Sequence, residues 1–457
     1  MSTTLLANSI DYHSAHVLHS QYQYTRVYPQ EGLGQYTVTN GAGPVMTFVI
    51  APKVMNLAES NLLYTISLPT QGAAAATWMN VNGMKHFTNV TVQAANSDYL
   101  MLIPNIDAYL DVIARRSFAF DDVQTWDQAA SYAAATPLGN QTFYEGLIPS
   151  NFINANDVCI DGTPSVKTGQ ESVYALGSGL NTAFYLDVKF KLDKFVDTIL
   201  AMNHNTYYAG NNLTITITFA PLSSYCWSGT ANANPNTGAV ASTVNATITA
   251  PYLLLAVEQN QAIVKDIVDR CSSQTGMTYR IPFVRMAKQP IPQGVNSITA
   301  QYTSSMGKYL QKVWFGAYAT NPATPNLVFD KSNLANAKLT LIQSKIDDIP
   351  IQQLAINPGI GEDYLYRRDE IRGSDILSFN EFLYNYAWCD NFTEKHDQFL
   401  KTLFPDIPSE NLIDGIPMSK DQFKYSVDFT SAAALTYYIF SVWLREVTIT
   451  GSLITIT

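Results

Sequence analysis

The sequence predicts an all-β protein with two β domains of the same plan in tandem and a few short helices. Short runs rich in β-branched and aromatic residues recur along the whole chain, and Gly, Pro and Asn separate them. The order of these runs in the first half is repeated in the second. A chain of 457 residues is also too long for one ordinary domain and suggests two, or three.

The first half contains seven strand candidates. In the clearest, 213–221, Leu213, Ile215, Ile217 and Phe219 alternate with threonines, as expected for a strand with one face in a core. We expect these four side chains inside and Thr214, Thr216 and Thr218 on the other face. The candidates of this half are 44–52, 62–69, 88–95, 172–177, 184–190, 213–221 and 247–258.

The second half contains seven more. Its apolar run at 432–444 is shorter than the roughly 20 residues that a membrane span needs, and it predicts a buried strand. In the last strand the alternation changes phase at Gly451-Ser452, which predicts a β-bulge. The candidates are 278–286, 297–304, 310–320, 337–346, 424–429, 435–444 and 447–457.

Four helices are predicted, at 106–116, 192–202, 260–270 and 378–388. Asn260 is the expected N-cap of the third, and Ser378 and Glu381 have the spacing of a capping box in the fourth. The apolar residues of the first two helices fall on one face: Ile106, Leu110, Ile113, Leu192, Phe195, Ile199 and Met202.

The two halves follow one order of elements. Each begins with paired strands, reaches a middle strand (88–95 or 337–346) followed by a helix, and closes with strands after a long polar region. We therefore expect the similar threonine-rich stretches 211–221 and 447–457 to seal the two domains. The predicted division is an N-terminal arm 1–35, a first domain 36–258, a linker helix 259–275 and a second domain 276–457. The polar segments 121–170 and 228–242 are expected to be long loops at one end of a sandwich.

The composition favours a protein that makes broad, permanent contacts. Charged residues are only 14% of the chain, hydrophobic residues are 47%, and there are 27 tyrosines. The net charge is −10, and the first 40 residues contain Arg26 and no lysine. Nucleic-acid-binding proteins gather Lys and Arg on one face, so we expect no specific nucleic-acid binding.

The four cysteines are far apart and include no CxxC pair. Cys159, Cys226, Cys271 and Cys389 therefore predict neither a disulfide framework nor a zinc site, and we expect them to be reduced and mostly buried. No secretory segment follows Met1, so a soluble protein made in a cytoplasm is expected.

Sequence motifs of catalysis are absent. The chain has no GxxxxGK[ST], GxGxxG, HExxH or GxSxG. His13, His16 and His19 are three residues apart, but their polar surroundings favour a terminal arm over a metal site. The adjacent carboxylates Asp121-Asp122, Asp347-Asp348 and Glu362-Asp363 favour turns over a glycosidase pair. We thus expect no enzyme activity, with no catalytic, cofactor-binding or metal-binding residues and no cofactor.

The chain resembles the double jelly-roll major capsid proteins of tailless icosahedral double-stranded DNA viruses, the lineage of adenoviruses, tectivirus-like phages, virophages and polinton-like elements. The resemblance covers about residues 36–457 and consists of strand patterns without a short signature motif. Five stretches carry it: "FYLDVKFKLDKFVDTIL", "NNLTITITFAP", "TAPYLLLAVE", "IPFVRMAKQPIPQGVNSITAQYTSSMGKYLQKVWFGAY" and "LTLIQSKIDDIPIQQL".

The resemblance implies two tandem eight-stranded antiparallel jelly rolls, so one strand of each roll is missing from our fourteen candidates. It also implies a structural major capsid protein that trimerises into pseudo-hexameric capsomers of an icosahedral virion shell. The implied partners are other copies of the chain as a homotrimer and as neighbouring capsomers, penton and minor capsid proteins, and an internal membrane. The implied location is the virion, after synthesis in the host cytoplasm.

Two other function classes remain open on the sequence. A carbohydrate- or receptor-binding β-sandwich, such as a spike or adhesin, could use aromatic loop residues to stack on sugars; Trp126, Tyr144 and Trp227 are the candidates. A glycoside-acting enzyme with jelly-roll domains is the third reading. Stable trimers or shells would favour the capsid protein, and monomers with sugar affinity would favour the spike or adhesin.

Overall fold

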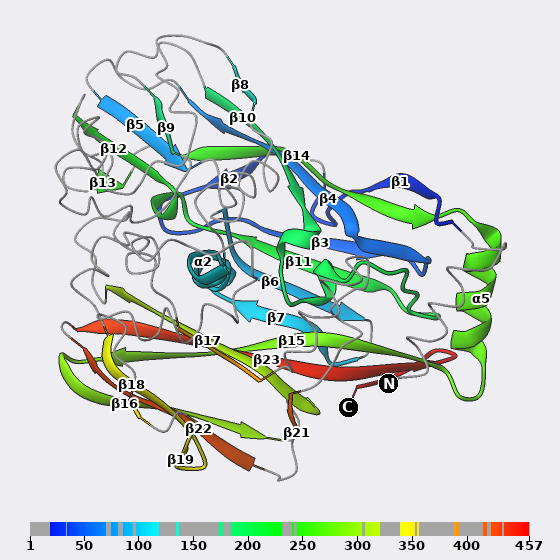
Figure 1. Ribbon diagram of the computed structural model, residues 1–457. Coiled ribbons are helices and arrows are strands. Elements are labelled where there is room, and N and C mark those ends of the chain that lie inside the picture. Colours follow the sequence, from blue (N-terminus) through cyan, green and yellow to red (C-terminus); the bar gives the residue numbers. More distant parts are fainter. Residues whose placement is uncertain are drawn as a thin grey trace.

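The computed structural model is nearly all β, as predicted (Figure 1). The residues that it describes are 19–32, 34–69, 75–80, 86–94, 97–117, 134–136, 173–176, 184–230, 240–241, 245–303, 307–319, 339–351, 354–355, 388–392, 415–417, 422–431 and 434–456.

The first roll contains eight strands in two antiparallel sheets. The β1 sheet has the order β1-β14-β4-β10, and the β3 sheet has the order β3-β11-β6-β7. The first, eighth, third and sixth strands of the roll thus form one sheet, which is jelly-roll topology. The strands are β1 (Tyr22–Val27), β3 (Val45–Ile50), β4 (Met55–Leu68), β6 (Phe87–Ala94), β7 (Tyr99–Pro104), β10 (Phe184–Lys191), β11 (Leu213–Phe219) and β14 (Ala246–Glu258). Two short strands, β2 (Tyr36–Val38) and β8 (Ala134–Thr136), extend the β1 sheet.

The second roll repeats this topology strand by strand. Its β15 sheet has the order β15-β23-β17-β20, and its β16 sheet has the order β16-β22-β18-β19. The strands are β15 (Met277–Ile291), β16 (Gly294–Thr303), β17 (Tyr309–Ala319), β18 (Leu339–Ile346), β19 (Ile349–Pro350), β20 (Trp388–Asn391), β22 (Gln422–Ser431) and β23 (Leu435–Thr450). Two further strands, β21 (Ile416–Pro417) and β24 (Leu453–Ile456), add to the β15 sheet. The tandem plan read from the sequence is confirmed.

Each roll has eight strands, as expected, but two strands of each roll, and not one, are missing from the sequence candidates. The missing strands are β1 and β7 in the first roll and β19 and β20 in the second. The candidates 172–177 and 447–457 instead include β9 and β24, which are not among the sixteen strands of the two rolls. β1 is a polar edge strand within the predicted arm 1–35, and it pairs with β14 from Tyr22 to Val27. The β1 sheet therefore begins before residue 36.

The two threonine-rich stretches do not occupy equivalent positions. β11 is the seventh strand of its roll, and its four apolar side chains are at most 1% exposed, as predicted. The stretch 447–457 instead contains the end of the eighth strand, β23, and the added strand β24. The predicted bulge is a hairpin turn, because Gly451 has a φ of 59° and reverses the chain with Ser452.

Two of the predicted helices are α-helices, α2 (Ile106–Ser117) and α5 (Gln261–Ser272). Asn260 caps α5 as predicted, since its side chain accepts a hydrogen bond of 3.1 Å from the Ala262 N–H. The prediction of one helix over 192–202 is wrong. Asp197 has a φ of 53°, which interrupts the segment between the single-turn helices η2 (Leu192–Lys194) and η3 (Ile199–Ala201). A third single turn, η4 (Leu222–Ser224), follows β11. Of the predicted helix 378–388, residues 378–387 lie outside the described residues, and Trp388 begins strand β20.

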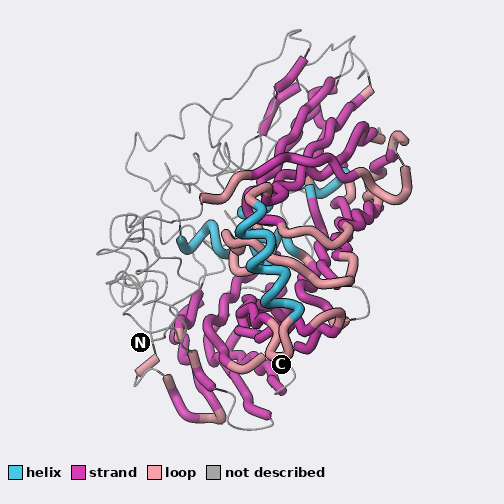
Figure 2. Tube along the Cα trace, turned by 90° about the vertical axis from the view of Figure 1, so that its right-hand side faces the viewer, coloured by secondary structure: helices cyan, strands magenta, loops and turns pink. Residues whose placement is uncertain are grey.

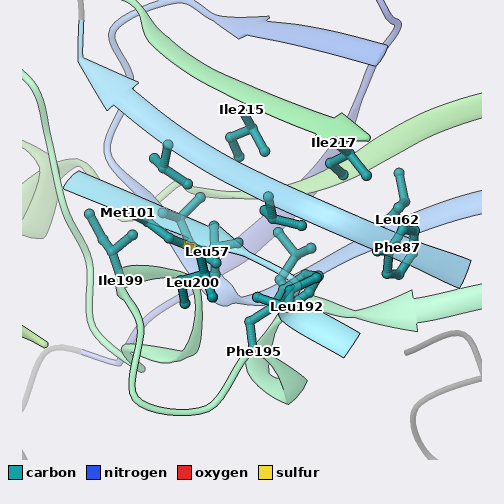
Figure 3. Packing of buried hydrophobic residues seen from close by; sticks show 14 of the residues in the cluster. Leu57, Leu62, Phe87, Met101, Leu192, Phe195, Ile199, Leu200, Ile215 and Ile217 are labelled. Atoms are coloured by element: carbon teal, nitrogen blue, oxygen red, sulfur yellow. The ribbon is translucent and has the colours of Figure 1, made fainter. Parts of the chain in front are cut away.

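The core of the first roll fills the space between its two sheets. Figure 3 shows Phe87, Ile215 and Ile217 packed with side chains of the 192–200 segment, including Leu192 and Phe195. Hence the apolar face predicted for the 192–202 segment is buried even though the segment is not an α-helix.

Three connections of the first roll form a small sheet of their own at one end, which we call the tower. Its order is β13-β12-β5-β9, and its strands are β5 (Ala75–Asn80), β9 (Val173–Leu176), β12 (Cys226–Thr230) and β13 (Val240–Ala241). The tower stands at the upper left of Figure 1, at the end opposite α5. Most of the predicted loops 121–170 and 228–242 lies outside the described residues.

Candidate assembly surfaces

The β15 sheet is packed on both of its faces. In the middle of its strands, one set of alternate residues joins the core of the second roll, and the residues between them join the core cluster of the first roll. Phe283, Val313 and Ile439 face the β16 sheet, whereas Val284, Trp314 and Phe440 belong to the first-roll cluster. One apolar cluster therefore crosses the boundary between the rolls.

Helix α2 fills the space between the first roll and the β15 sheet. The rings of Tyr109 and Phe440 lie 5.1 Å apart, and a Cβ atom at Gly316 would lie only 2.6 Å from Val112 Cγ2. The buried Tyr109 hydroxyl donates to Asp197 Oδ2 at 3.4 Å. Burial and the charge of Asp197 raise the pKa of Tyr109. Lys312 Nζ contacts Asp197 Oδ1 at 3.4 Å, which ties the second roll to the same carboxylate.

Strand β7, the edge of the β3 sheet, lies against β15, the edge of the neighbouring sheet. The buried Arg445 guanidinium donates to the Tyr99 carbonyl oxygen at 3.2 Å and stacks 3.5 Å from the centre of the Phe283 ring. Burial and the nearby Arg285 lower the pKa of Arg445 to about 10. Leu102 packs on the core of the second roll. β7 thus forms a direct side-by-side contact between the rolls.

A single carboxylate fixes the junction near α5. Glu258, 3% exposed at the end of β14, accepts hydrogen bonds from the N–H groups of Gln21 (2.8 Å), Gln259 (3.0 Å) and Asn260 (2.9 Å), and from Asn205 Nδ2 (2.9 Å). Burial alone would raise the pKa of this carboxyl group, but the hydrogen bonds outweigh it and lower the pKa. The carboxylate therefore joins the segment before β1, the start of α5 and the β10–β11 connection.

The two rolls lie side by side in the same sense. The last strands of the two rolls, β14 and β23, both end at the α5 end. Their first strands, β1 and β15, are antiparallel to them and therefore both run away from that end (Figure 1). Figure 2 looks onto the α5 end, where this helix passes from one roll to the other. In addition, Gly451 N donates to Cys271 O at 2.7 Å, and Asn211 Nδ2 donates to Ser452 O at 2.8 Å.

Two surfaces of the described chain expose large apolar or aromatic side chains in groups. On the outer face of the β1 sheet, Tyr24 is 50% exposed and Tyr28 is 44% exposed. At the edge strand β19 and just beyond it, Ile349 is 70%, Ile351 37% and Leu354 79% exposed. Grouped apolar exposure of this kind is typical of interaction surfaces.

The predicted turn at Asp347-Asp348 is confirmed. Both residues have positive φ values, 49° and 66°, as a two-residue type I′ hairpin between β18 and β19 requires. Asp347 Oδ1 accepts from Lys424 N at 2.9 Å, and Asp348 Oδ1 accepts from Lys424 Nζ at 3.0 Å. These carboxylates therefore hold a hairpin in place and do not face a common cleft.

Several residues singled out in the sequence lie outside the described residues: His13, His16, Asp121, Asp122, Trp126, Tyr144, Cys159, Glu362 and Asp363. His19 is exposed where the description begins, and Trp227 lies in β12 of the tower. Cys226, Cys271 and Cys389 are buried, as predicted, and none of the three is joined to another described residue by a disulfide. Among described side chains, no three His, Cys, Asp or Glu residues gather as a metal site would require. In the same part of the chain, no helix is long and apolar enough to span a membrane.

No protein-family model matches the chain, and no curated protein matches its sequence. Solved structures do match nearly its full length. A structure of the Sputnik virophage matches with a TM-score of 0.55 at 9% identity, covering 97% of this chain and 90% of the other. The Faustovirus major capsid protein matches with a TM-score of 0.54 at 10% identity, covering 96% and 92%. The PBCV-1 virus capsid matches with a TM-score of 0.50 at 7% identity, covering 98% and 99%.

At these identities the likeness shows a shared fold. The chain therefore has the double jelly-roll fold that its sequence pattern resembled, over almost its whole length.

Proposed function

We propose that the protein is a structural major capsid protein that assembles as a homotrimer into the shell of an icosahedral virion. The observation that carries this proposal is the packing of two rolls of identical strand order side by side in the same sense. Three such chains supply six similar units, so a closed ring of three has a pseudo-hexameric outline and can tile a shell.

The surface composition supports the same role. Only 14% of the residues are charged, and the large aromatic side chains exposed on the β1 sheet are the tyrosines Tyr24 and Tyr28. Permanent interfaces are depleted in Lys and Glu and enriched in Tyr, so this surface is more typical of a subunit in an assembly than of a monomer. We propose no catalytic role and no cofactor for the chain.

Other partners follow from the same proposal. Penton and minor capsid proteins would contact the outer rim of the capsomer, and an internal membrane would face one of its ends. The arm, the two rolls and the linker 259–275 would then act as one building block. The chain would be made in the host cytoplasm and would end in the virion.

Purified protein tests this proposal directly. Mass photometry should show a species of three times the 50.5 kDa chain mass, and electron microscopy should show pseudo-hexagonal capsomers or closed shells. A protein that stays monomeric at about micromolar concentration and binds sugars would contradict the proposal and favour the spike or adhesin.

A further inference from the structure

We propose that the β19 edge of one copy packs on the outer face of β1 and β14 of the next copy, as β7 packs on β15 within the chain. This inference rests on the proposed trimer and names the surfaces that close it. The edge consists of Ile349, Ile351 and Leu354, which we call the β19 edge. Its receiving surface consists of Tyr24, Arg26, Tyr28 and Tyr252, which we call the β1 face.

The internal repeat supplies the geometry. β7 and β19 are each the fifth strand of their roll and each forms the edge of its sheet after a hairpin from the fourth strand. β1 and β15 are each the first strand of their roll and each forms the edge of the opposite sheet. The contact of β7 with β15 within the chain therefore has one counterpart between chains, the contact of β19 with β1.

The fifth strands β7 and β19 differ in burial, as expected if β19 has its neighbour in another copy. In β7, which has its neighbour within the chain, Leu102 is half-buried against the core of the second roll, and only Tyr99 at the start of the strand is exposed, at 37%. In the β19 edge, Ile349 is 70% exposed and Leu354 is 79% exposed. Large apolar side chains exposed together at the edge of a sheet are typical of an interaction surface, so the β19 edge calls for an occupant.

The β1 face has the chemistry of an interface anchor. The Arg26 guanidinium lies over the Tyr252 ring, 4.9 Å from its centre, and the Tyr28 and Tyr252 rings are 6.2 Å apart. Tyr24, two residues before Arg26 on the same face of β1, is half exposed. Tyrosine and arginine are the residues most often responsible for binding energy at protein interfaces, together with tryptophan.

A second copy is the occupant that the fold favours. β1 and β19 lie on opposite sides of the molecule in Figure 1, so the two surfaces of one chain cannot meet each other. A contact between two different surfaces of identical chains is head-to-tail, and such a contact closes into a ring when the rotation per chain allows it. Because each chain contains two rolls in one sense, three chains complete six equal steps.

Two kinds of substitution test the two surfaces: a lysine in place of an apolar residue on the β19 edge, and a reversed charge on the β1 face. Ile349→Lys and Leu354→Lys should each raise the concentration at which half of the trimer dissociates by about tenfold or more, which corresponds to the loss of a hot-spot residue. Val295→Lys is the matched control, because Val295 is 85% exposed on β16 at the opposite edge of the same sheet. Arg26→Glu should weaken the trimer similarly, and Lys265→Glu, on the exposed side of α5, should change it less than about twofold.

Photo-cross-linking separates this inference from the proposed function. A benzophenone amino acid at position 349 should form cross-links to residues 22–28 or 252–254 of another copy, and one at position 295 should not. Trimers whose cross-links from position 349 map elsewhere, and which tolerate Ile349→Lys, would overturn the assignment of surfaces and leave the trimer standing. The absence of any trimer in the unmodified protein would instead overturn the proposed function.

Discussion

At the residue scale, single-residue alternation predicted the core well. Leu213, Ile215 and Ile217 are buried and the threonines between them are partly exposed, because a strand directs successive side chains to opposite faces. In the middle of the β15 sheet, the same alternation decides which of the two core clusters a residue joins, as in Phe283 and Val284. The sequence could not show this second case, because both faces of that sheet are apolar.

Ile215→Ala should lower the free energy of unfolding by about 2–5 kcal/mol, since it removes a fully buried side chain and leaves a cavity. Thr216→Ala, on the other face of the same strand, should change it by less than about 1 kcal/mol. Urea unfolding of both variants checks the pair. Equal losses from the two substitutions would show that the strand is not oriented as described.

Glu258→Gln should lower the free energy of unfolding at neutral pH by about 1–3 kcal/mol. The NH₂ group of the glutamine cannot accept the hydrogen bonds that the carboxylate accepts from Asn205 Nδ2 and the Asn260 N–H. The pKa of Glu258 is lowered from its ordinary 4.5, so the stabilisation is full above that pH and is lost as the pH falls through the lowered value. The unfolding free energy of the unmodified protein should therefore fall more between about pH 5 and pH 3 than that of the variant. Parallel pH profiles would contradict this role.

At the element scale, the sequence predicted the elements that carry a clear period. Strand β11 and helices α2 and α5 were found because their apolar residues recur at every second position or at every third to fourth position, and β23 was found from its continuous apolar run. β19 escaped because two residues carry no period, and β7 escaped because its run YLMLIP is apolar on both faces. The segment 192–202 has helical spacing but is broken by the backbone at Asp197, which spacing does not report.

Helix α2 gives an element-scale prediction. Gly316→Ala should destabilise the protein by about 1–3 kcal/mol, because the added methyl group would overlap Val112 where the helix meets the β15 sheet. The double variant Gly316→Ala/Val112→Ala should be more stable than the sum of the two single losses predicts, by about 0.5 kcal/mol or more. Thermal unfolding of the four proteins measures this coupling, and strictly additive losses would place Val112 away from Gly316.

At the scale of the whole molecule, the sequence predicted the tandem plan but not the surfaces that we propose for assembly. The order of strands and the low charge were visible in the chain, and the resemblance led to the correct fold. The sequence did not indicate the β1 face, because β1 lies within the predicted N-terminal arm 1–35. The best signal for the β19 edge in the sequence was the Asp347-Asp348 pair, which marks a tight hairpin, followed by Ile349 and Ile351.

The net charge of −10 gives a prediction for the intact protein. It should show no retention on duplex DNA at about 0.15 M salt, because affinity for phosphates depends on the number neutralised by Lys and Arg. Two arginine pairs are the groups that could reverse this expectation: Arg115-Arg116 at the end of α2, and Arg367-Arg368, which lies outside the described residues. Salt-dependent binding that disappears when either pair is changed to alanine would contradict the prediction.

The apolar cluster that crosses from the first roll into the β15 sheet also constrains how such a chain can evolve. Val284, Trp314 and Phe440 come from the second roll but belong to the core cluster of the first, so the first roll does not carry its complete interior by itself. Recombination that exchanged one roll for that of a relative would bring together two halves of a core that had not been selected together. The gene should consequently be inherited as one unit, with substitutions at this boundary changing in concert across the two halves.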